Sequence, residues 1–238
     1  MLILAIDTAS PFCATGLINN NRLLAKVNKS IGKRHAECLM EQIMSVMDEA
    51  HKNFSDIDRI SVNTGPGSFT GVRVGVSAAR GLALALDRPA IGINTFEALA
   101  FETAQHYKDR PITIVLEAHR GTLYVQDFNA KNQAIRFPRI DTAEAIAATL
   151  SKTTLLRGSG VYKITQRTCH PFFDTTSTAD IEIYAFLAAR KKKSEKANPL
   201  YMHPPDVKPK AAIPFLPFSG EINCCKQGKV LSEKHKCP

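Results

Sequence analysis

The chain has 238 residues, with 31 Lys and Arg against 22 Asp and Glu, so its formal net charge is +9 with His neutral. Hydrophobic residues make up 44% and charged residues 22%, a composition that excludes disorder throughout the chain. No apolar run approaches the ~20 residues that span a bilayer, and Asp7, with no basic residue before it, argues against a signal peptide. We therefore expect a cytoplasmic protein that contacts no membrane and keeps its six cysteines reduced.

Strand and helix patterns alternate along the first half of the chain. Apolar runs and turn residues predict strands over 2–9, 12–18 and 23–27, with a turn at 19–21. A helix over 34–51 follows, because apolar residues recur there at helical spacing. The next predicted elements are a strand over 57–63, a helix over 71–86, a strand over 89–93 and a helix over 96–107.

The same order of elements recurs in the second half, which indicates an internal duplication. The pattern predicts strands over 112–116, 123–128, 135–140 and 154–157, and helices over 142–150 and 178–193, the first capped by Asp141. In each copy, three strands followed by alternating helices predict a mixed sheet with helices on its faces. We expect an α/β protein with a first lobe over 1–108, a reduced second lobe over 109–197 and an extended Pro- and Lys-rich tail over 198–238.

The positive charge is concentrated in the second half. Residues 1–108 carry 11 basic and 10 acidic side chains, whereas residues 109–238 carry 20 and 12, a balance of +8. The densest basic run covers 190–193. Such a run either contacts RNA phosphates or ends a solvated helix, where cations complement the helix dipole. The solvated helix end is favoured, because no aromatic residues that could stack on bases interleave with the run.

The most informative segment is Gly-Pro-Gly-Ser-Phe-Thr-Gly at 65–71, which joins a predicted strand to the start of a helix. Glycines there let the backbone approach a ligand, and free N–H groups at a helix start favour an anion. The segment is not a Walker A loop, because Val72 and Arg73 follow where Lys and Ser or Thr would stand. A tight turn that opens a crowded helix explains the glycines equally well, so both interpretations stay open.

Small residues recur along the helix over 71–86, although each Gly in a helix interior costs ~1 kcal/mol relative to Ala. Close approach by another helix, from the same chain or a second subunit, would offset that cost. Methionines on the helix over 34–51 suit an adaptable contact surface. We therefore predict an interface on these two helices and expect Gly75→Leu or Ala79→Leu to abolish partner binding. The candidate interface residues are Leu39, Met40, Ile43, Met44, Met47, Gly71, Val72, Gly75, Ala79 and Ala83.

Other polar residues give weaker signals. Asp7 ends the first strand, where a carboxylate either holds a hydrated Mg²⁺ near a nucleotide or caps a turn. Glu117, His119 and Arg120 stand at a predicted hairpin turn, where an exposed charged turn is favoured over a substrate site. His35 is interpreted as a surface or capping residue. Neither a metal-ligand spacing nor a nucleophile set is visible, so we expect no catalytic residue, no metal and no cofactor.

Three segments carry a resemblance to a known family. They read Leu-Ala-Ile-Asp-Thr-Ala at 4–9, Gly-Pro-Gly-Ser-Phe-Thr-Gly-Val-Arg-Val-Gly at 65–75 and Ala-Arg-Gly-Leu-Ala at 79–83. With Arg120-Gly121, Tyr124 and Pro199-Leu200-Tyr201, they resemble the bacterial TsaB family, also called YeaZ, over about residues 1–210. Glu117 and His119 depart from the Asp-Ala-Arg turn usual in that family, and the Cys-rich end from Ala211 has no counterpart. The family-motif residues are Asp7, Gly65, Pro66, Gly67, Ser68, Phe69, Thr70, Gly71 and Arg73.

The resemblance implies the fold shared by actin, Hsp70 and the sugar kinases (the ASKHA fold), which agrees with two repeated lobes. It also implies a role in making N6-threonylcarbamoyladenosine (t6A) at position 37 of tRNAs that read ANN codons. In that pathway a metal-binding relative, TsaD, transfers the threonylcarbamoyl group, and a small ATPase, TsaE, joins the complex. The TsaB family is the partner of TsaD, and older labels call such proteins glycoprotease-like or M22 peptidase-like.

The resemblance also suggests whether this chain is the enzyme or its partner. TsaD holds its metal with His-x-x-x-His, and Thr95 and Leu99 stand at the two ligand positions here, where Leu cannot bind a metal. This implies a non-catalytic scaffold that activates TsaD and forms a homodimer when alone, with tRNA contacted indirectly. The alternatives are a small ATPase or kinase that uses Asp7 and the loop over 65–71, direct tRNA binding between Arg190 and Lys210, or the older peptidase label.

Overall fold

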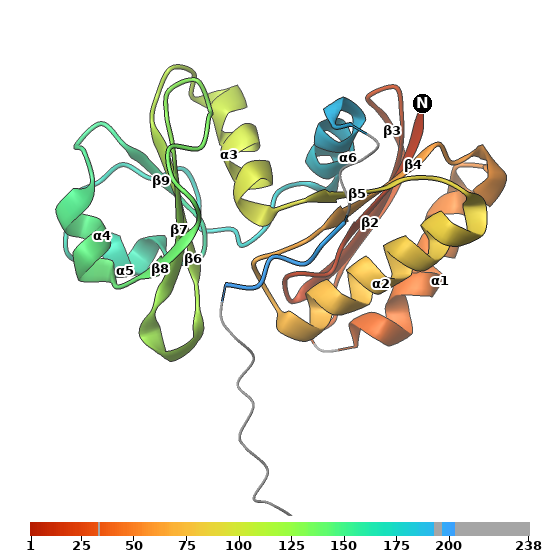
Figure 1. Ribbon diagram of the computed structural model, residues 1–238, viewed down its shortest axis with the longest axis horizontal. Helices are drawn as coiled ribbons and strands as arrows, with labels where there is room; N and C mark the ends of the chain where they lie inside the picture. Colours follow the sequence, from red (N-terminus) through yellow and green to blue (C-terminus); the bar gives the residue numbers. More distant parts are fainter. Residues whose placement is uncertain (33, 193–196, 203–238) are drawn as a thin grey trace, which may run out of the picture. The chain divides into compact units, whose positions relative to one another are not determined.

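The first sheet has five strands in the order β3-β2-β1-β4-β5 (Figure 1). They are β1 (Leu2–Asp7), β2 (Phe12–Asn19), β3 (Arg22–Ser30), β4 (Arg59–Asn63) and β5 (Ala90–Ile93). β2 pairs antiparallel with β1 and β3, whereas β4 runs parallel to β1 and β5, because helices connect these strands. Asn20 and Asn21 turn the chain between β2 and β3 with φ angles of 46° and 67°, a region that Asn tolerates well.

The second sheet repeats this arrangement with four strands in the order β8-β7-β6-β9. They are β6 (Ile112–Glu117), β7 (Leu123–Phe128), β8 (Arg139–Asp141) and β9 (Leu155–Arg157). β7 pairs antiparallel with β6 and β8, and β9 runs parallel to β6. The strand order of the first four strands is therefore the same in both copies, which confirms the predicted α/β fold of two mixed sheets with a reduced second copy.

The computed structural model describes residues 1–32, 34–192 and 197–202. Within them, α1 (His35–Glu49) and α2 (Phe69–Leu86) cover one face of the first sheet, and α4 (Ala143–Thr149) and α5 (Val161–Thr165) cover one face of the second (Figure 1). Short 3₁₀ turns occupy Phe54–Asp56 and His119–Gly121. Predictions for residues 203–238, including the Cys-rich end and most of the tail, lie outside the described residues.

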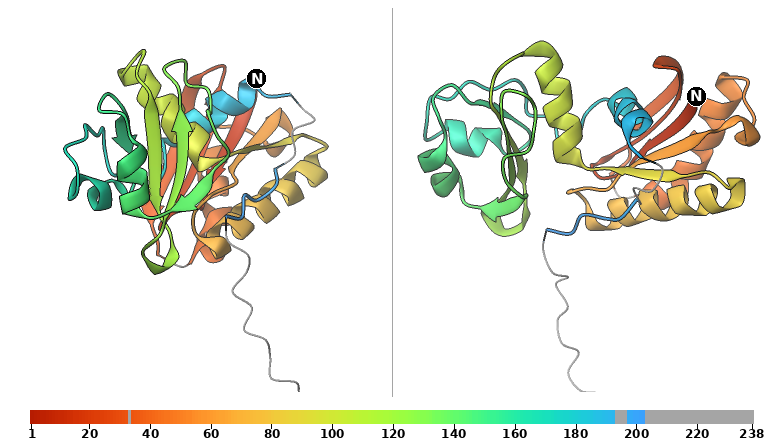
Figure 2. Two further views of the ribbon diagram at one scale, coloured as in Figure 1. Left: turned by 60° about the vertical axis from the view of Figure 1, so that its left-hand side comes forward. Right: turned by 45° about the horizontal axis from the view of Figure 1, so that its top comes forward.

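Two helices are exchanged between the copies. α3 (Thr95–His106) follows the first sheet but packs against β6 and β9 of the second, whereas α6 (Ile181–Arg190) follows the second sheet and packs against the first (Figures 1 and 2). Both contribute to one central core that includes Phe96, Leu99 and Tyr184. The division into two lobes between residues 108 and 109 stays a prediction. The strands of each sheet come from one side of this boundary, whereas α3 and α6 each pack against the sheet of the other side.

Strand alternation explains how the second sheet serves two cores. Ile112, Ile114 and Leu116 pack into the central core, whereas Val115 between them packs against α4 and α5. Successive side chains of a strand point to opposite faces, so β6 is apolar on both sides. This double burial fixes the sheet between α3 and the α4–α5 pair.

Three sequence predictions for the second copy were wrong in detail. The strand predicted over 135–140 is reduced to β8, because Pro138 has no N–H to donate to the ladder, and Phe137 before it is 92% exposed. The cap of α4 is Thr142, whose hydroxyl accepts from the Ala145 N–H, and Asp141 instead ends β8. α5 was not predicted, because five residues carry too little helical periodicity.

α2 is long and apolar enough by composition to cross a membrane, with a mean hydropathy of 1.2 over 18 residues. Arg73 and Arg80 interrupt this segment, so the sequence contains no unbroken apolar run of that length. Val72, Val76 and Ala79 pack into the core beneath the helix. An amphipathic core helix meets the same criterion, so α2 carries no membrane prediction.

Candidate functional site

The glycines of the 65–71 loop and of α2 fit against the backbone that follows β1. A Cβ at Gly67 would collide with the Ala9 carbonyl, and one at Gly71 with the Thr8 carbonyl. At Gly75 it would collide with the Thr8 hydroxyl, which donates to the Gly71 carbonyl. These three glycines let the loop and α2 lie directly on the segment that follows β1, so their close contact is with this segment and not with the helix of the same chain that was predicted.

The loop itself is held by hydrogen bonds within the protein. The Gly65 N–H donates to Asn63 Oδ1 at 2.8 Å, and Gly65 has a φ angle of 90°. The Ser68 N–H donates to the Ala9 carbonyl at 2.6 Å, and the Ser68 hydroxyl accepts from the Gly71 N–H at 3.2 Å as the cap of α2. These contacts favour the tight-turn interpretation over the anion site.

Asp7 lies at the centre of a buried polar network. Its Oδ1 accepts from the Ala9 N–H at 2.8 Å and from Asn63 Nδ2 at 3.0 Å, and its Oδ2 accepts from the Thr178 hydroxyl. Burial raises the pKa of the Asp7 carboxyl, against these hydrogen bonds, which lower it. The carboxylate joins β1 to β4 and to the segment before α6, and protein donors occupy both of its oxygens.

The same network includes Thr95, one of the two positions at which the resemblance places the metal ligands of TsaD. The Thr95 hydroxyl lies 3.0 Å from Asn63 Oδ1 and 3.0 Å from the Pro66 carbonyl. Leu99 is buried in the central core. Within the described parts of the chain, no three His, Cys, Asp or Glu side chains lie close enough to hold a metal ion.

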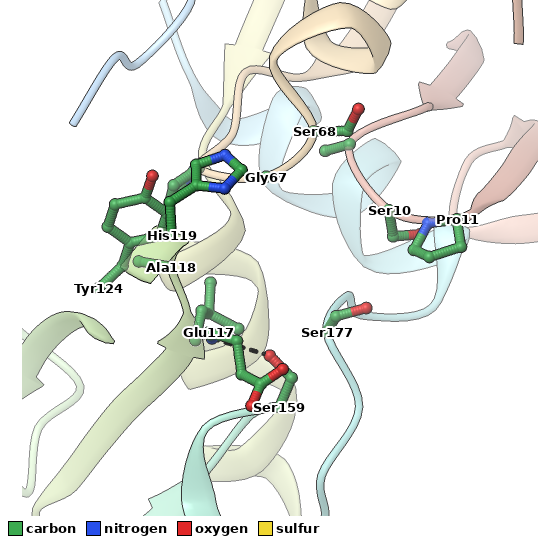
Figure 3. A pocket seen from close by; sticks show the side chains of 13 residues that line it. Ser10, Pro11, Gly67, Ser68, Glu117, Ala118, His119, Tyr124, Ser159 and Ser177 are labelled. Atoms are coloured by element: carbon green, nitrogen blue, oxygen red, sulfur yellow. Dashed lines mark hydrogen bonds between the residues drawn. The ribbon is translucent and has the colours of Figure 1, made fainter. Parts of the chain in front are cut away.

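A cleft of about 240 Å³ opens between the 65–71 loop and the second sheet (Figure 3). It is lined from the first copy by Ala9, Ser10, Pro11, Pro66, Gly67 and Ser68, and from the second by Leu116, Glu117, Ala118, His119, Tyr124, Ser159 and Ser177. The fold thus brings together the glycine-rich loop and the polar turn at 117–121, which the sequence marked separately.

The cleft is lined by apolar groups together with polar side chains that are mostly uncharged. The Glu117 N–H donates to the Ser159 hydroxyl at 3.0 Å (Figure 3). The Glu117 carboxylate pairs with Lys163 at 3.0 Å. Burial raises the pKa of the Tyr124 phenol, which keeps it a neutral hydrogen-bonding group. The described residues that line the cleft include one carboxylate but neither Lys nor Arg. The volume of the cleft is below the ~300–1,000 Å³ usual for ligand pockets. The cleft suits a small neutral ligand better than a nucleotide triphosphate.

The predicted interface residues divide into buried and exposed sets. Met40 and Met44 of α1 are 43% and 55% exposed, and Ala83 of α2 is partly exposed. The other seven are buried under the two helices, against the chain's own first sheet: Leu39, Ile43, Met47, Gly71, Val72, Gly75 and Ala79. The expectation for Gly75→Leu and Ala79→Leu stays a prediction, and because both positions are buried, a large side chain there would disturb the core as well as any partner contact.

Two further exposed residues of α2 lie outside the predicted interface set. Leu84 is 86% exposed, and Gly81 has no atom within 4 Å of the place where a Cβ would stand. Both face away from the buried side of the helix. Their signal in the sequence was their offset from the buried Val72, Val76 and Ala79, which share one helical face.

Residues 197–202 form an extended segment along α2, and 198–202 are the part of the predicted tail that the structure describes. The Leu200 N–H donates to the Thr64 carbonyl at 2.8 Å, and Arg80 donates to Asn198 Oδ1 at 2.5 Å. The Arg73 guanidinium lies 3.7 Å from the Phe69 ring centre and donates to the Tyr201 hydroxyl at 3.0 Å. Thr70, beside them, is exposed.

His35 holds one wall of the cleft, although its sequence context suggested a surface or capping residue, and Arg157 holds the end of β9, which no sequence pattern indicated. His35 is buried, and its Nε2 lies 2.8 Å from the carbonyl of Ser10, a cleft residue. Arg157 is buried at the end of β9, where it pairs with Glu102 at 2.5 Å and with Asp174 at 3.1 Å. A lone His at a helix start and a lone Arg at a strand end carry no local pattern, so only the fold shows their partners.

Comparison with known proteins gives a consistent assignment. The family profile described as TsaD, tRNA N6-adenosine threonylcarbamoyltransferase, matches residues 23–174. The chain is 33% identical over 132 residues to the tRNA threonylcarbamoyladenosine biosynthesis protein TsaB of Bacillus subtilis, covering 56% of this chain and 57% of that protein. It is 27% identical over 170 residues to TsaB of Buchnera aphidicola from Schizaphis graminum, covering 68% and 80%. The chain belongs to the TsaB (YeaZ) family.

The solved structures agree with this family. YeaZ from Pseudomonas aeruginosa superimposes with a TM-score of 0.70 at 23% identity, covering 84% of this chain and 99% of that one. At that identity the likeness shows the fold alone. The match spans little more than half the length of the Bacillus relative. The TsaD profile covers the 65–71 loop and the turn at 117–121, but it begins after Asp7 and ends before α6.

Proposed function

We propose that this chain is a non-catalytic partner that binds and activates a TsaD-type transferase during t6A modification of tRNA in the cytoplasm. The observation that carries the proposal is which residues occupy the two positions at which the resemblance places the metal ligands of TsaD. Thr95 is committed to the loop through Asn63 and Pro66, and Leu99 is packed in the core. A hydroxyl and a hydrocarbon do not replace two imidazoles as ligands.

The exposed faces of α1 and α2 are the surface we assign to the partner. Met40, Met44 and Leu84 are exposed there, and Gly81 leaves room for another helix to approach. Exposed methionines adapt to a partner surface, and exposed large apolar groups on monomers commonly mark interaction sites. The same surface would pair two copies of this chain when TsaD is absent, and TsaE would join the heterodimer.

The composition of the cleft argues against the ATPase or kinase alternative. A triphosphate would meet Glu117 and no Lys or Arg among the described lining residues. Asp7, which that alternative uses as a Mg²⁺ ligand, is buried with both oxygens occupied. The peptidase label gains no support, because no metal cluster is found among the described residues.

A reconstituted reaction tests the proposal. TsaD, TsaE, tRNA and threonylcarbamoyl-adenylate are combined with and without this chain, and t6A is measured by nucleoside mass spectrometry. We expect product only when both TsaD and this chain are present, and none from this chain alone. Product from this chain without TsaD, or the same yield after its omission, would overturn the proposal.

Leu84→Glu tests the assigned surface. Because Leu84 is 86% exposed, the substitution should leave the fold intact while it places a charge in the helix contact. We expect binding to TsaD, measured by calorimetry, to weaken by at least about tenfold, as for a central interface residue. Ile135→Glu is the matched control, because Ile135 is also exposed but lies before β8 in the second copy. Equal affinity of both variants would place the contact elsewhere.

A further inference from the structure

A second cavity, of about 480 Å³, lies beside α3 and α6. Its apolar part includes Phe101 from α3 and Phe186 from α6, whose ring centres are 5.2 Å apart. Its polar part includes the side chains of Asn21, Gln105, Glu182 and Arg190. None of its residues lines the cleft at the 65–71 loop. The cavity is therefore a separate feature, which the proposed partner role does not use.

Arg190 contacts the rings of this cavity instead of a carboxylate. Its guanidinium carbon lies 3.6 Å from the Phe186 ring centre and 5.9 Å from that of Phe101. Arg190 is exposed, and both phenylalanines are only partly buried. An arginine plane beside aromatic rings is the kind of platform on which unstacked nucleic-acid bases stack.

The acidic side chains of α3 and α6 near the cavity are already paired. Glu182 binds Lys26 at 3.1 Å, Glu97 binds Lys191 at 2.9 Å, and Glu102 binds Arg157 at 2.5 Å. Among the described residues, no ion pair involves Arg190. Its positive charge, with Lys192 two residues later in the sequence, is thus available to a phosphate.

We propose that this cavity binds an unstacked base of a single-stranded RNA segment. The base would stack on the Phe186–Arg190 platform, and the adjacent phosphate would lie near Arg190. The amides of Asn21 and Gln105 offer both donors and acceptors to the edge of the base. The basic run at 190–193 lacks aromatic residues in the sequence, but the fold supplies them from α3 and α6. The proposal is independent of the scaffold role, because it concerns this chain alone.

Binding of a short single-stranded RNA that carries one 2-aminopurine tests the site. The full chain is titrated, with anisotropy reporting affinity and 2-aminopurine quenching reporting stacking. We expect Phe186→Leu to weaken binding by at least about fivefold and to abolish the quenching, since the base loses the aromatic ring on which it stacks. Arg190→Gln should weaken binding to a similar extent and lower its salt dependence. Circular dichroism and thermal melting establish that both variants are folded.

Arg88→Gln is the matched control, because it removes the same charge from an exposed position that does not line the cavity. It should leave affinity and quenching unchanged. Equal weakening by Arg88→Gln and Arg190→Gln, with no effect of Phe186→Leu, would mean diffuse electrostatic binding and would overturn the site. Free AMP is then added as a competitor, at the same concentration at which the RNA half-saturates the chain. If AMP displaces all of the RNA at this concentration, the cavity is a mononucleotide site, and the proposal of an RNA site is overturned.

Discussion

The two copies of the fold both end their first strand on a carboxylate, yet they use it in opposite ways. Asp7 at the end of β1 is buried and accepts hydrogen bonds from Ala9, Asn63 and Thr178. Glu117 at the end of β6 has a side chain that is 54% exposed and pairs with Lys163 beside the cleft. In the first copy the carboxylate at the strand end holds neighbouring segments of the chain together, whereas in the second copy the carboxylate lies at the cleft.

The glycine-rich loops extend the comparison. In the first copy the loop leads into α2 with 18 residues and a serine cap, and Gly71 packs on Thr8. In the second copy Gly158 packs on the Val115 carbonyl in the same manner, but α5 has five residues and no side-chain cap. In both copies glycine is needed because a side chain at this position would collide with the backbone at or after the end of the first strand. A long exposed helix that could contact a partner follows only in the first copy.

The largest expected effect concerns the buried ion pairs of the second copy. Arg157→Met removes the partner of Glu102 and Asp174 and leaves Glu102 largely buried without a cation. We expect the free energy of unfolding in urea to fall by ~3–5 kcal/mol. Lys163→Met removes the partner of the exposed Glu117 and should cost ~0–1 kcal/mol. Equal losses of stability would show that the ion pairs of Arg157 and of Lys163 do not differ in strength as their burial indicates.

Gly71→Ala and Gly81→Ala compare the two sides of α2. A methyl group at Gly71 meets the Thr8 carbonyl, so we expect a loss of ~1–3 kcal/mol from overpacking. A methyl group at Gly81 meets no atom within 4 Å, so helix propensity should raise stability by ~0.5–1 kcal/mol. Thermal and urea unfolding measure both. Stabilisation by Gly71→Ala would contradict the packing role of the loop glycines.

The smallest effect is a pH dependence from Asp7. Burial raises the pKa of Asp7 above its ordinary value of 3.8, so the folded chain keeps this proton to higher pH than the unfolded chain. The stability that Asp7 contributes is complete below pH 3.8 and is lost as pH rises through the folded pKa. The wild type should therefore lose stability relative to Asp7→Asn as pH rises through this window. Parallel unfolding curves at all pH values would contradict the raised pKa.

Much of the fold could be predicted from the sequence, because its signals are local. Period-2 and period-3.6 apolar patterns located the strands of the first sheet and helices α1, α2 and α3. Among the short elements, α5 was not predicted and β8 was predicted too long, since both have too few residues to show a period. The interface predicted on α1 and α2 stays a hypothesis, and most of the residues chosen for it lie on the apolar face, which the chain buries itself.

The sequence by itself determined the duplicated order of elements, the glycine-rich loop and the membership in the TsaB family, because each depends on residues close together in the chain. Only the tertiary structure decided which glycines pack on Thr8, which helix face is exposed, and that α3 and α6 exchange sheets. It also placed Phe101 and Phe186 next to Arg190. These facts depend on contacts between residues far apart in sequence, and burial selects such contacts only when the whole core forms.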